Sequence, residues 1–147
     1  MASRDRDLDG RPRQSRPRDA LGRPLPYGAV GVPPIPEDAL PPREAVAEAQ
    51  RLLAAGQPFA AHEVFEARWK AAPPAERDLW QGLAQLCVGI THARRGNLVG
   101  GRRLVQRGAD RLESYRAGSG PSHGADLDAW LAAARAEVSA AEVSPEG

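Results

Sequence analysis

Apolar side chains recur every three or four residues between positions 41 and 142, the spacing that puts them on one side of an α-helix. Prolines and glycines divide this stretch into five helical segments, at about 42–55, 59–71, 76–95, 98–115 and 126–138. No run of β-branched residues alternates with polar ones, so we expect no sheet. The pattern predicts an all-α fold in which residues 41–142 form a single compact domain of about five helices, packed as helical hairpins.

The two ends of the sequence lack this periodicity. Residues 1–40 are rich in Arg, Asp and Pro, a composition that predicts a disordered to extended arm. Apolar residues within 22–36 would allow that part of the arm to lie against the domain. Residues 143–147 are expected to fray.

Glycines on two of the predicted helices indicate close packing. Gly101 and Gly108 lie in the apolar seam of segment 98–115, and Gly82 and Gly89 lie in segment 76–95. A glycine inside a helix costs about 1 kcal/mol relative to alanine, so an offsetting gain is expected. Close approach of the two backbones would supply it, and leucine at Gly101 or Gly108 should then overpack the interface.

Composition and charge narrow the range of partners. The formal net charge is +1, which argues against a nucleic-acid partner, and we interpret the arginines of 94–111 as a solvated helix face. The longest uncharged run, 79–93, is shorter than the roughly 20 residues of a membrane span. The first ten residues contain no apolar signal segment, so a cytoplasmic location is expected. Cys87, the single cysteine, is interpreted as a core residue.

One constellation of polar and aromatic residues could carry chemistry. On segment 59–71, His62 and Glu66 are one helical turn apart within an arc shared with aromatic residues, and Glu63 lies just beyond its edge. On segment 76–95, Gln81, Gln85 and His92 share one stripe. If the two helices pack as an antiparallel pair, these sets would face each other across a polar cleft. We expect its roof to consist of Phe65, Trp69 and Trp80.

Three interpretations of this cleft remain open. The residues could form a hydrogen-bonded network that fixes the register of the two helices. They could line a pocket for a small ligand or a partner peptide. His62, Glu66 and His92 could instead bind a divalent metal ion, although the sequence from His62 to Glu66 departs from the His-Glu-x-x-His zinc motif at its second ligand.

Other residues give weaker indications. His123 lies between glycine, serine and proline residues and is expected to be solvated. Apolar faces on the first and last predicted helices could serve a homodimer as well as the core. No nucleophile has a base at a recognisable spacing, so no catalytic residue is assigned and the question of enzymatic activity stays open.

The same residues resemble a known bacterial family. The run from His62 to Glu66, with Trp69, the stretch 79–86 and Arg95-Gly96-Asn97, is similar to the family called domain of unknown function 309, over about residues 45–112. Phe65 stands where that family typically has Leu or Val. The resemblance implies an all-α, cytoplasmic bacterial protein and no established activity. The motif residues it suggests are His62, Glu63, Glu66, Trp69, Gln81, Gly82, Gln85, His92, Gly96 and Asn97.

Two functional hypotheses follow from the sequence. The first is a non-enzymatic binding module whose polar cleft takes a small ligand or a partner helix. The alternative is a metal-dependent hydrolase that uses His62, Glu66 and His92 as ligands and Glu63 as the base.

Overall fold

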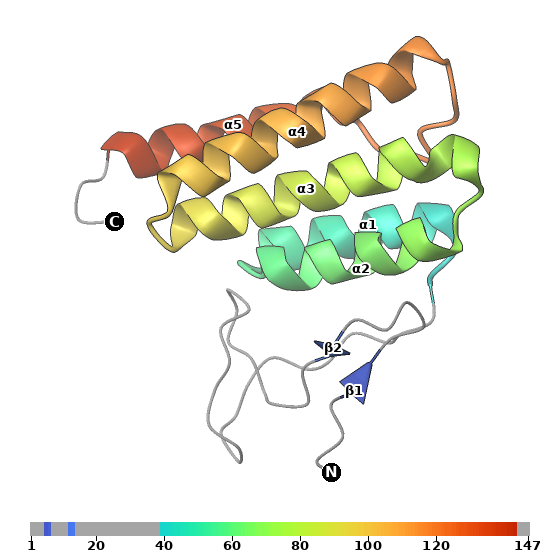
Figure 1. Cartoon of the computed structure of the whole chain (residues 1–147), viewed down its shortest axis with the longest axis horizontal. Helices are drawn as coiled ribbons and strands as arrows, with labels where there is room; N and C mark the ends of the chain where they lie inside the picture. Colours follow the sequence, from blue (N-terminus) through green and yellow to red (C-terminus); the bar gives the residue numbers. More distant parts are fainter. Residues whose placement is uncertain (1–4, 7–11, 14–38, 144–147) are drawn as a thin grey trace.

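The helices of the computed structural model, which describes residues 5–6, 12–13 and 39–143, confirm the all-α prediction (Figure 1). Their bounds lie close to the expected ones. A single 3-10 turn, η1, spans Pro74–Glu76 and precedes α3. The helices are α1 (Pro42–Ala54), α2 (Pro58–Ala71), α3 (Arg77–Arg94), α4 (Leu98–Ala117) and α5 (Leu127–Val143).

Local chemistry explains where several helices begin and end. Prolines occupy the first position of α1 and α2, where a missing backbone N–H costs nothing. The Asn97 side chain caps α4 by accepting a hydrogen bond from the Gly100 N–H at 3.0 Å. Gly56 and Gly96 follow α1 and α3 with φ of +78° and +88°, a left-handed conformation that glycine adopts without strain. These two turns produce the two expected hairpins.

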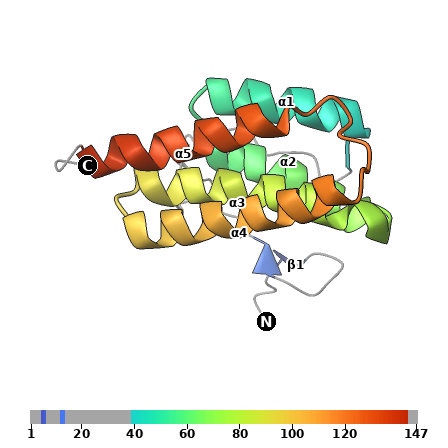
Figure 2. The same ribbon diagram turned by 90° about the horizontal axis from the view of Figure 1, so that it is seen from above.

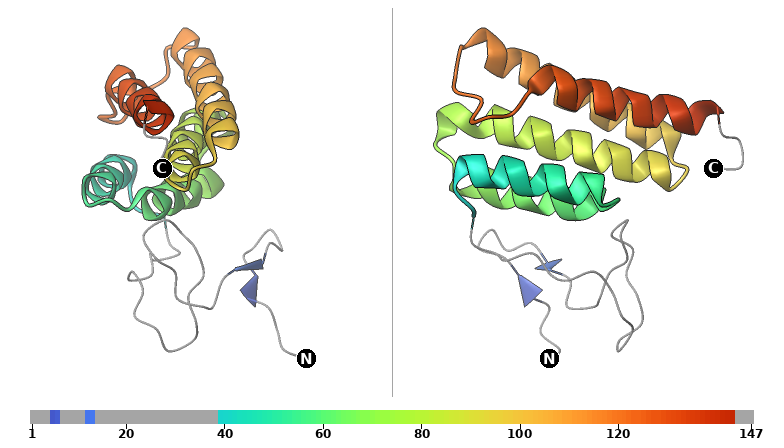
Figure 3. Two further views of the ribbon diagram at one scale, coloured as in Figure 1. Left: turned by 90° about the vertical axis from the view of Figure 1, so that its left-hand side faces the viewer. Right: turned by 180° about the vertical axis from the view of Figure 1, so that it is seen from behind.

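The helices lie in two layers. Seen end on, α2, α3 and α4 form one curved layer, and α1 and α5 form the second layer, against its inner face (Figure 3). The view from above shows α5 running alongside α3 and α4 (Figure 2). The core fills the space between the layers, and its largest fully buried side chains include Trp80, Phe65, Leu83 and Leu86. None of the described helices is long and apolar enough to cross a membrane.

A glycine seam between α3 and α4, formed by Gly82, Gly89, Gly101 and Gly108, lies where the sequence predicts it. A Cβ atom built on Gly108 would be 2.8 Å from the Gly82 carbonyl oxygen, and one built on Gly101 would be 3.0 Å from the Gly89 carbonyl oxygen. A side chain at Gly108 would force the backbones apart, and one at Gly101 would make a contact tighter than ordinary van der Waals contact. The backbones of α3 and α4 therefore approach closely because these positions are glycine.

The apolar faces that could have served a homodimer lie in the core. Ala45, Val46, Ala49 and Leu52 of α1 are buried. The apolar stripe of α5 is buried as well, through Leu127, Trp130, Leu131, Ala134 and Val138. Among the described residues the one exposed large hydrophobic side chain is Val99. The two faces are therefore used within this chain.

Two details differ from the expectations. Helix α5 continues to Val143, five residues beyond the expected end, because the Ala-rich sequence that follows Val138 contains no helix breaker. A two-residue antiparallel pairing joins β1 (Asp5–Arg6) to β2 (Pro12–Arg13), with Asp5 opposite Arg13. We expected no sheet, but so short a pairing needs no apolar alternation, and it leaves the fold class unchanged. The rest of the predicted arm, up to 38, and the tail 144–147 lie outside the described residues.

Candidate functional site

A cavity of about 140 Å³ opens between α2 and α3. Its α2 wall consists of His62, Glu66 and Trp69, spaced at three and four residues so that they share one side of the helix. The α3 wall repeats this spacing. It consists of Gln81, Ala84, Gln85 and Val88. The structure thus brings together most of the residues expected in the polar cleft.

Both ring nitrogens of His62 are engaged within α2. Nε2 lies 2.8 Å from Glu66 Oε2, and Nδ1 lies 3.3 Å from the Phe59 carbonyl oxygen. The Phe59 ring lies 5.0 Å away between centroids and limits the movement of the imidazole. A metal ligand or a general base needs a ring nitrogen with an available lone pair. In this arrangement His62 instead holds the Glu66 carboxylate in place.

Glu66 supplies a fixed negative charge to the cavity. The hydrogen bond from His62, helped by the charges of His62 and Lys70, lowers the pKa of the Glu66 carboxyl to about 2, although partial burial acts in the opposite direction. Lys70 Nζ lies 3.5 Å from Glu66 Oε1. The side chain is 30% exposed. Glu66 is therefore an ionised hydrogen-bond acceptor at neutral pH.

Gln85 supplies an oriented amide on the opposite wall. Arg111 of α4 donates through Nε to Gln85 Oε1 at 3.1 Å, and through Nη1 to Asp78 Oδ1 at 3.1 Å. Within the described part of the chain, neither Gln81 nor Gln85 is hydrogen-bonded to His62 or Glu66. The hydrogen-bonded network across α2 and α3, which was one of the three interpretations, is therefore not formed between these side chains.

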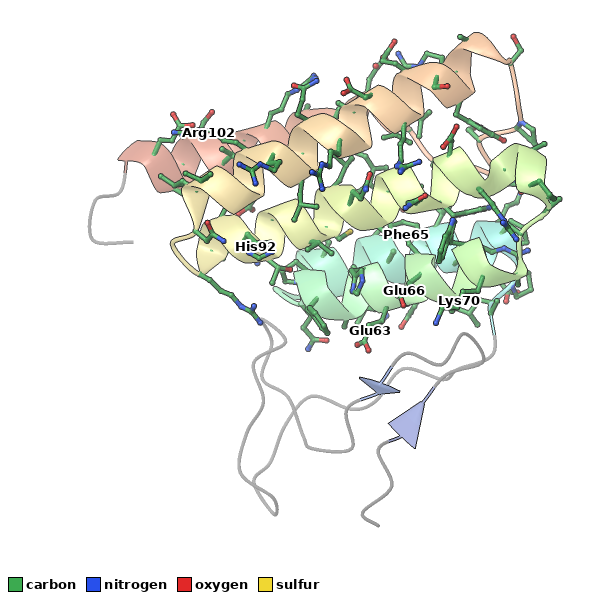
Figure 4. All side chains as sticks on the ribbon, viewed as in Figure 1. Glu63, Phe65, Glu66, Lys70, His92 and Arg102 are labelled. Atoms are coloured by element: carbon green, nitrogen blue, oxygen red, sulfur yellow. The ribbon has the colours of Figure 1, made fainter. Side chains whose placement is uncertain are left out.

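Two of the expected cleft residues lie outside the cavity. Glu63 is exposed on α2 (Figure 4). His92 lies near the C-terminal end of α3, where its Nδ1 is 3.1 Å from Asn97 Nδ2. The structure therefore does not assemble His62, Glu66 and His92 into a ligand set. Residues 39–143 contain no group of three or more His, Cys, Asp or Glu side chains that could hold a metal ion.

The expected aromatic roof is also different. Trp69 lines the cavity, but Phe65 and Trp80 are fully buried in the core. Their ring centroids are 6.2 Å apart, and the Phe65 ring packs edge-on against Trp130 of α5 at 5.3 Å. Phe65 therefore points into the core, toward α5. Cys87 is buried as expected, and burial raises the pKa of its thiol.

A second polar cluster has no counterpart in the sequence analysis. His123 Nε2 lies 3.1 Å from Glu76 Oε1, which also accepts a hydrogen bond from Trp80 Nε1 at 3.3 Å. The His123 ring stacks on Trp80 with centroids 5.7 Å apart. Its side chain is only 21% exposed, so the expectation that His123 is solvated is wrong. The i,i+4 spacing of Glu76 and Trp80 can be recognised in the sequence, but no local pattern links either residue to His123.

Comparisons with known proteins agree with the resemblance. Residues 46–104 match the family model described as Domain of unknown function (DUF309). Over 48 residues the chain is 44% identical to "Uncharacterized protein YpuF" of Bacillus subtilis (strain 168), covering 32% of this chain. The matched segment spans 28% of that relative's length. No solved structure matches.

Proposed function

The chain is related through residues 46–104 to the DUF309 family, and we propose that it is a non-enzymatic binding module whose cavity between α2 and α3 takes a small polar group. That group would be a small ligand or one side chain of a partner helix. The cavity of about 140 Å³ is smaller than the 300–1,000 Å³ of typical sites for drug-sized molecules. This size favours a single functional group over a whole cofactor.

One observation carries this proposal. Two of the polar groups that line the cavity, on opposite walls, are each held by a neighbour: Glu66 by His62, and Gln85 by Arg111. A purely structural network would satisfy the two groups with each other, because buried polar groups normally pair. Polar groups that are held in place around a cavity without such pairing are typical of a preorganised binding site.

The metal-dependent hydrolase has less support from the geometry. Its three ligands are not brought together, and both nitrogens of His62 are engaged. The proposed base, Glu63, lies outside the cavity. The geometry therefore favours the binding module over the hydrolase.

A comparison of two glutamine variants tests the proposal. Saturation-transfer NMR with a library of small polar fragments should detect ligands of the full chain, and Gln85→Leu should abolish the signals of those that occupy the cavity. Gln106→Leu is the matched control, because Gln106 is exposed on α4 and bonds only to Asp110 among the described residues.

The melting temperatures separate the binding and structural explanations. Both variants should melt within a few degrees of the parent, because Arg111 keeps its bond to Asp78 in Gln85→Leu. If Gln85→Leu unfolds, the cavity residues are structural. If its fragment signals equal those of Gln106→Leu, the cavity is not the binding site.

A further inference from the structure

The orientation of the Gln85 amide follows from its neighbour. Arginine can only donate hydrogen bonds, so the Gln85 oxygen must face Arg111 and the NH₂ group must point elsewhere. Asp78 holds the Arg111 guanidinium in turn, at 3.1 Å. Gln85, which lines the cavity, is therefore fixed as a hydrogen-bond donor on the α3 wall, whereas an unrestrained glutamine could present either end.

The opposite wall has the complementary property. The ionised Glu66 carboxylate accepts hydrogen bonds and has no hydrogen to donate. A guest that satisfies both walls needs a carbonyl oxygen for Gln85 and an N–H for Glu66. Trp69 adds aromatic surface to the α2 wall.

The size of the cavity limits the part of a guest that it can enclose to a few atoms. A water molecule occupies about 30 Å³ in the liquid, so the cavity volume corresponds to about five waters. A carboxamide with two or three carbons has a similar number of non-hydrogen atoms. A carboxylate of the same shape lacks the donor, and an ammonium group lacks the acceptor.

We infer that the cavity between α2 and α3 selects a neutral carboxamide, such as the side-chain amide of Asn or Gln, and that Arg111 is the positioning residue that sets this preference. The inference rests on the proposed binding function and names the class of its ligand. Arg111 lies on α4, outside the cavity lining, and acts through Gln85.

Three nearly isosteric probes test the selectivity. Propionamide, propionate and propylammonium are titrated into the ¹⁵N-labelled full chain while the side-chain NH₂ signals of Gln85 and Gln81 are followed. Propionamide should shift the Gln85 signals with an affinity of about 1 mM, as expected for so small a ligand. Propionate and propylammonium should bind at least about tenfold more weakly, since propionate has no donor for Glu66 and propylammonium has no acceptor for Gln85.

The role of Arg111 is tested with a matched pair of variants. Arg111→Leu frees the Gln85 amide to turn, so propionamide should bind about three- to tenfold more weakly while propylammonium gains affinity relative to it. Arg107→Leu removes the same charge one turn away on α4, at an exposed side chain, and should keep the preference of the parent. A merely structural role of Arg111 would not change the order of the probes.

The outcomes distinguish this inference from the proposed function. Equal affinity for all three probes would leave a binding cavity and overturn its selectivity for carboxamides. If none of the probes shifts the Gln85 signals, the carboxamide inference is wrong. The proposed function is wrong as well only if the fragment library also contains no ligand whose binding is lost in Gln85→Leu. Capped glutamine, N-acetyl-glutamine-N-methylamide, then separates sources: if it binds as propionamide does, the ligand is a protein side chain, and if it does not, a free amide.

Discussion

Two polar side chains of the cavity, Glu66 and Gln85, are held by short contacts with neighbours on the same or an adjacent helix. Within α2, the i,i+4 spacing of His62 and Glu66 is sufficient to form the 2.8 Å contact that holds the carboxylate. Gln85 instead depends on Arg111, which lies 26 positions further along the chain. The two walls are therefore fixed by different means, one local and one tertiary.

The lowered pKa of Glu66 predicts a specific dependence of stability on pH. Since this pKa is about 2 in the folded chain against an ordinary value of 4.5, the charged carboxylate stabilises the fold above about pH 4.5, and this contribution is lost as the pH falls toward 2. Glu66→Gln should thus lower the free energy of unfolding at pH 7 by about 1–2 kcal/mol, allowing for partial exposure, and by much less at pH 2.5. Urea denaturation at both pH values measures the difference.

Glu113→Gln serves as the control for this measurement. Its carboxylate is 64% exposed and lies 3.6 Å from Arg116, so its removal should change stability by less than about 0.5 kcal/mol at either pH. If the parent and Glu66→Gln lose the same free energy of unfolding between pH 7 and pH 2.5, the His62–Glu66 contact does not stabilise the fold.

At the scale of the elements, the α3–α4 pair is defined by contacts between backbones. Gly108 of α4 lies against Gly82 of α3, and Gly101 lies against Gly89. This close approach brings α4 near enough for Arg111 to reach Gln85. The glycines of the seam thus help to shape the cavity although none of them lines it.

Alanine at Gly108 should destabilise the protein although it favours the helix. The new Cβ would lie 2.8 Å from the Gly82 carbonyl oxygen, a backbone atom that cannot move independently of α3. We expect a net loss of about 1–3 kcal/mol from overpacking, despite a gain of about 1 kcal/mol in helix propensity. Thermal or urea unfolding measures it.

Gly118→Ala provides the comparison for the Gly108 variant. A Cβ on Gly118 would be 3.5 Å from the Tyr115 carbonyl oxygen, an ordinary contact, so stability should change by less than about 0.5 kcal/mol. If Gly108→Ala is as stable as Gly118→Ala, the α3–α4 interface has more freedom than its geometry indicates.

At the scale of the whole molecule, the connection between α4 and α5 links distant parts of the chain. His123, in this connection, stacks on Trp80 of α3 and bonds to Glu76 of η1. The Tyr115 hydroxyl donates to the Pro121 carbonyl oxygen at 2.6 Å. His123 has φ of +53°, an uncommon conformation outside glycine, which these side-chain contacts help to stabilise.

Removing the His123 ring should loosen this connection selectively. His123→Ala loses the stacking and the bond to Glu76, so the free energy of unfolding should fall by about 1–2 kcal/mol. Hydrogen exchange should accelerate across 118–126 and change little in the α1–α2 hairpin. Ser122→Ala, at an exposed neighbour, should exchange like the parent, and unchanged exchange in His123→Ala would contradict the role given to its ring.

The sequence by itself determined the helices and much of the candidate cavity. Proline at helix starts, glycine at helix ends and a period of 3.6 residues all act within a few positions of the chain, so they can be recognised without a partner. The same periodicity placed His62 and Glu66 on one side of α2, and Gln81 and Gln85 on one side of α3. The glycine seam was also predictable, because glycine within a helix needs an offsetting gain.

Only the tertiary structure decided which of these residues share the cavity. Helical angles do not fix position along the axis: His92 lies seven residues beyond Gln85, about 10 Å along α3, and meets Asn97 at the helix end. Helical angles also do not tell which neighbouring helix a given side of α2 faces. Phe65 and Trp69 share one predicted arc, yet Phe65 points into the core and Trp69 lines the cavity. Arg111 and His123 reach their partners from sites remote in sequence, through packing that no local pattern encodes.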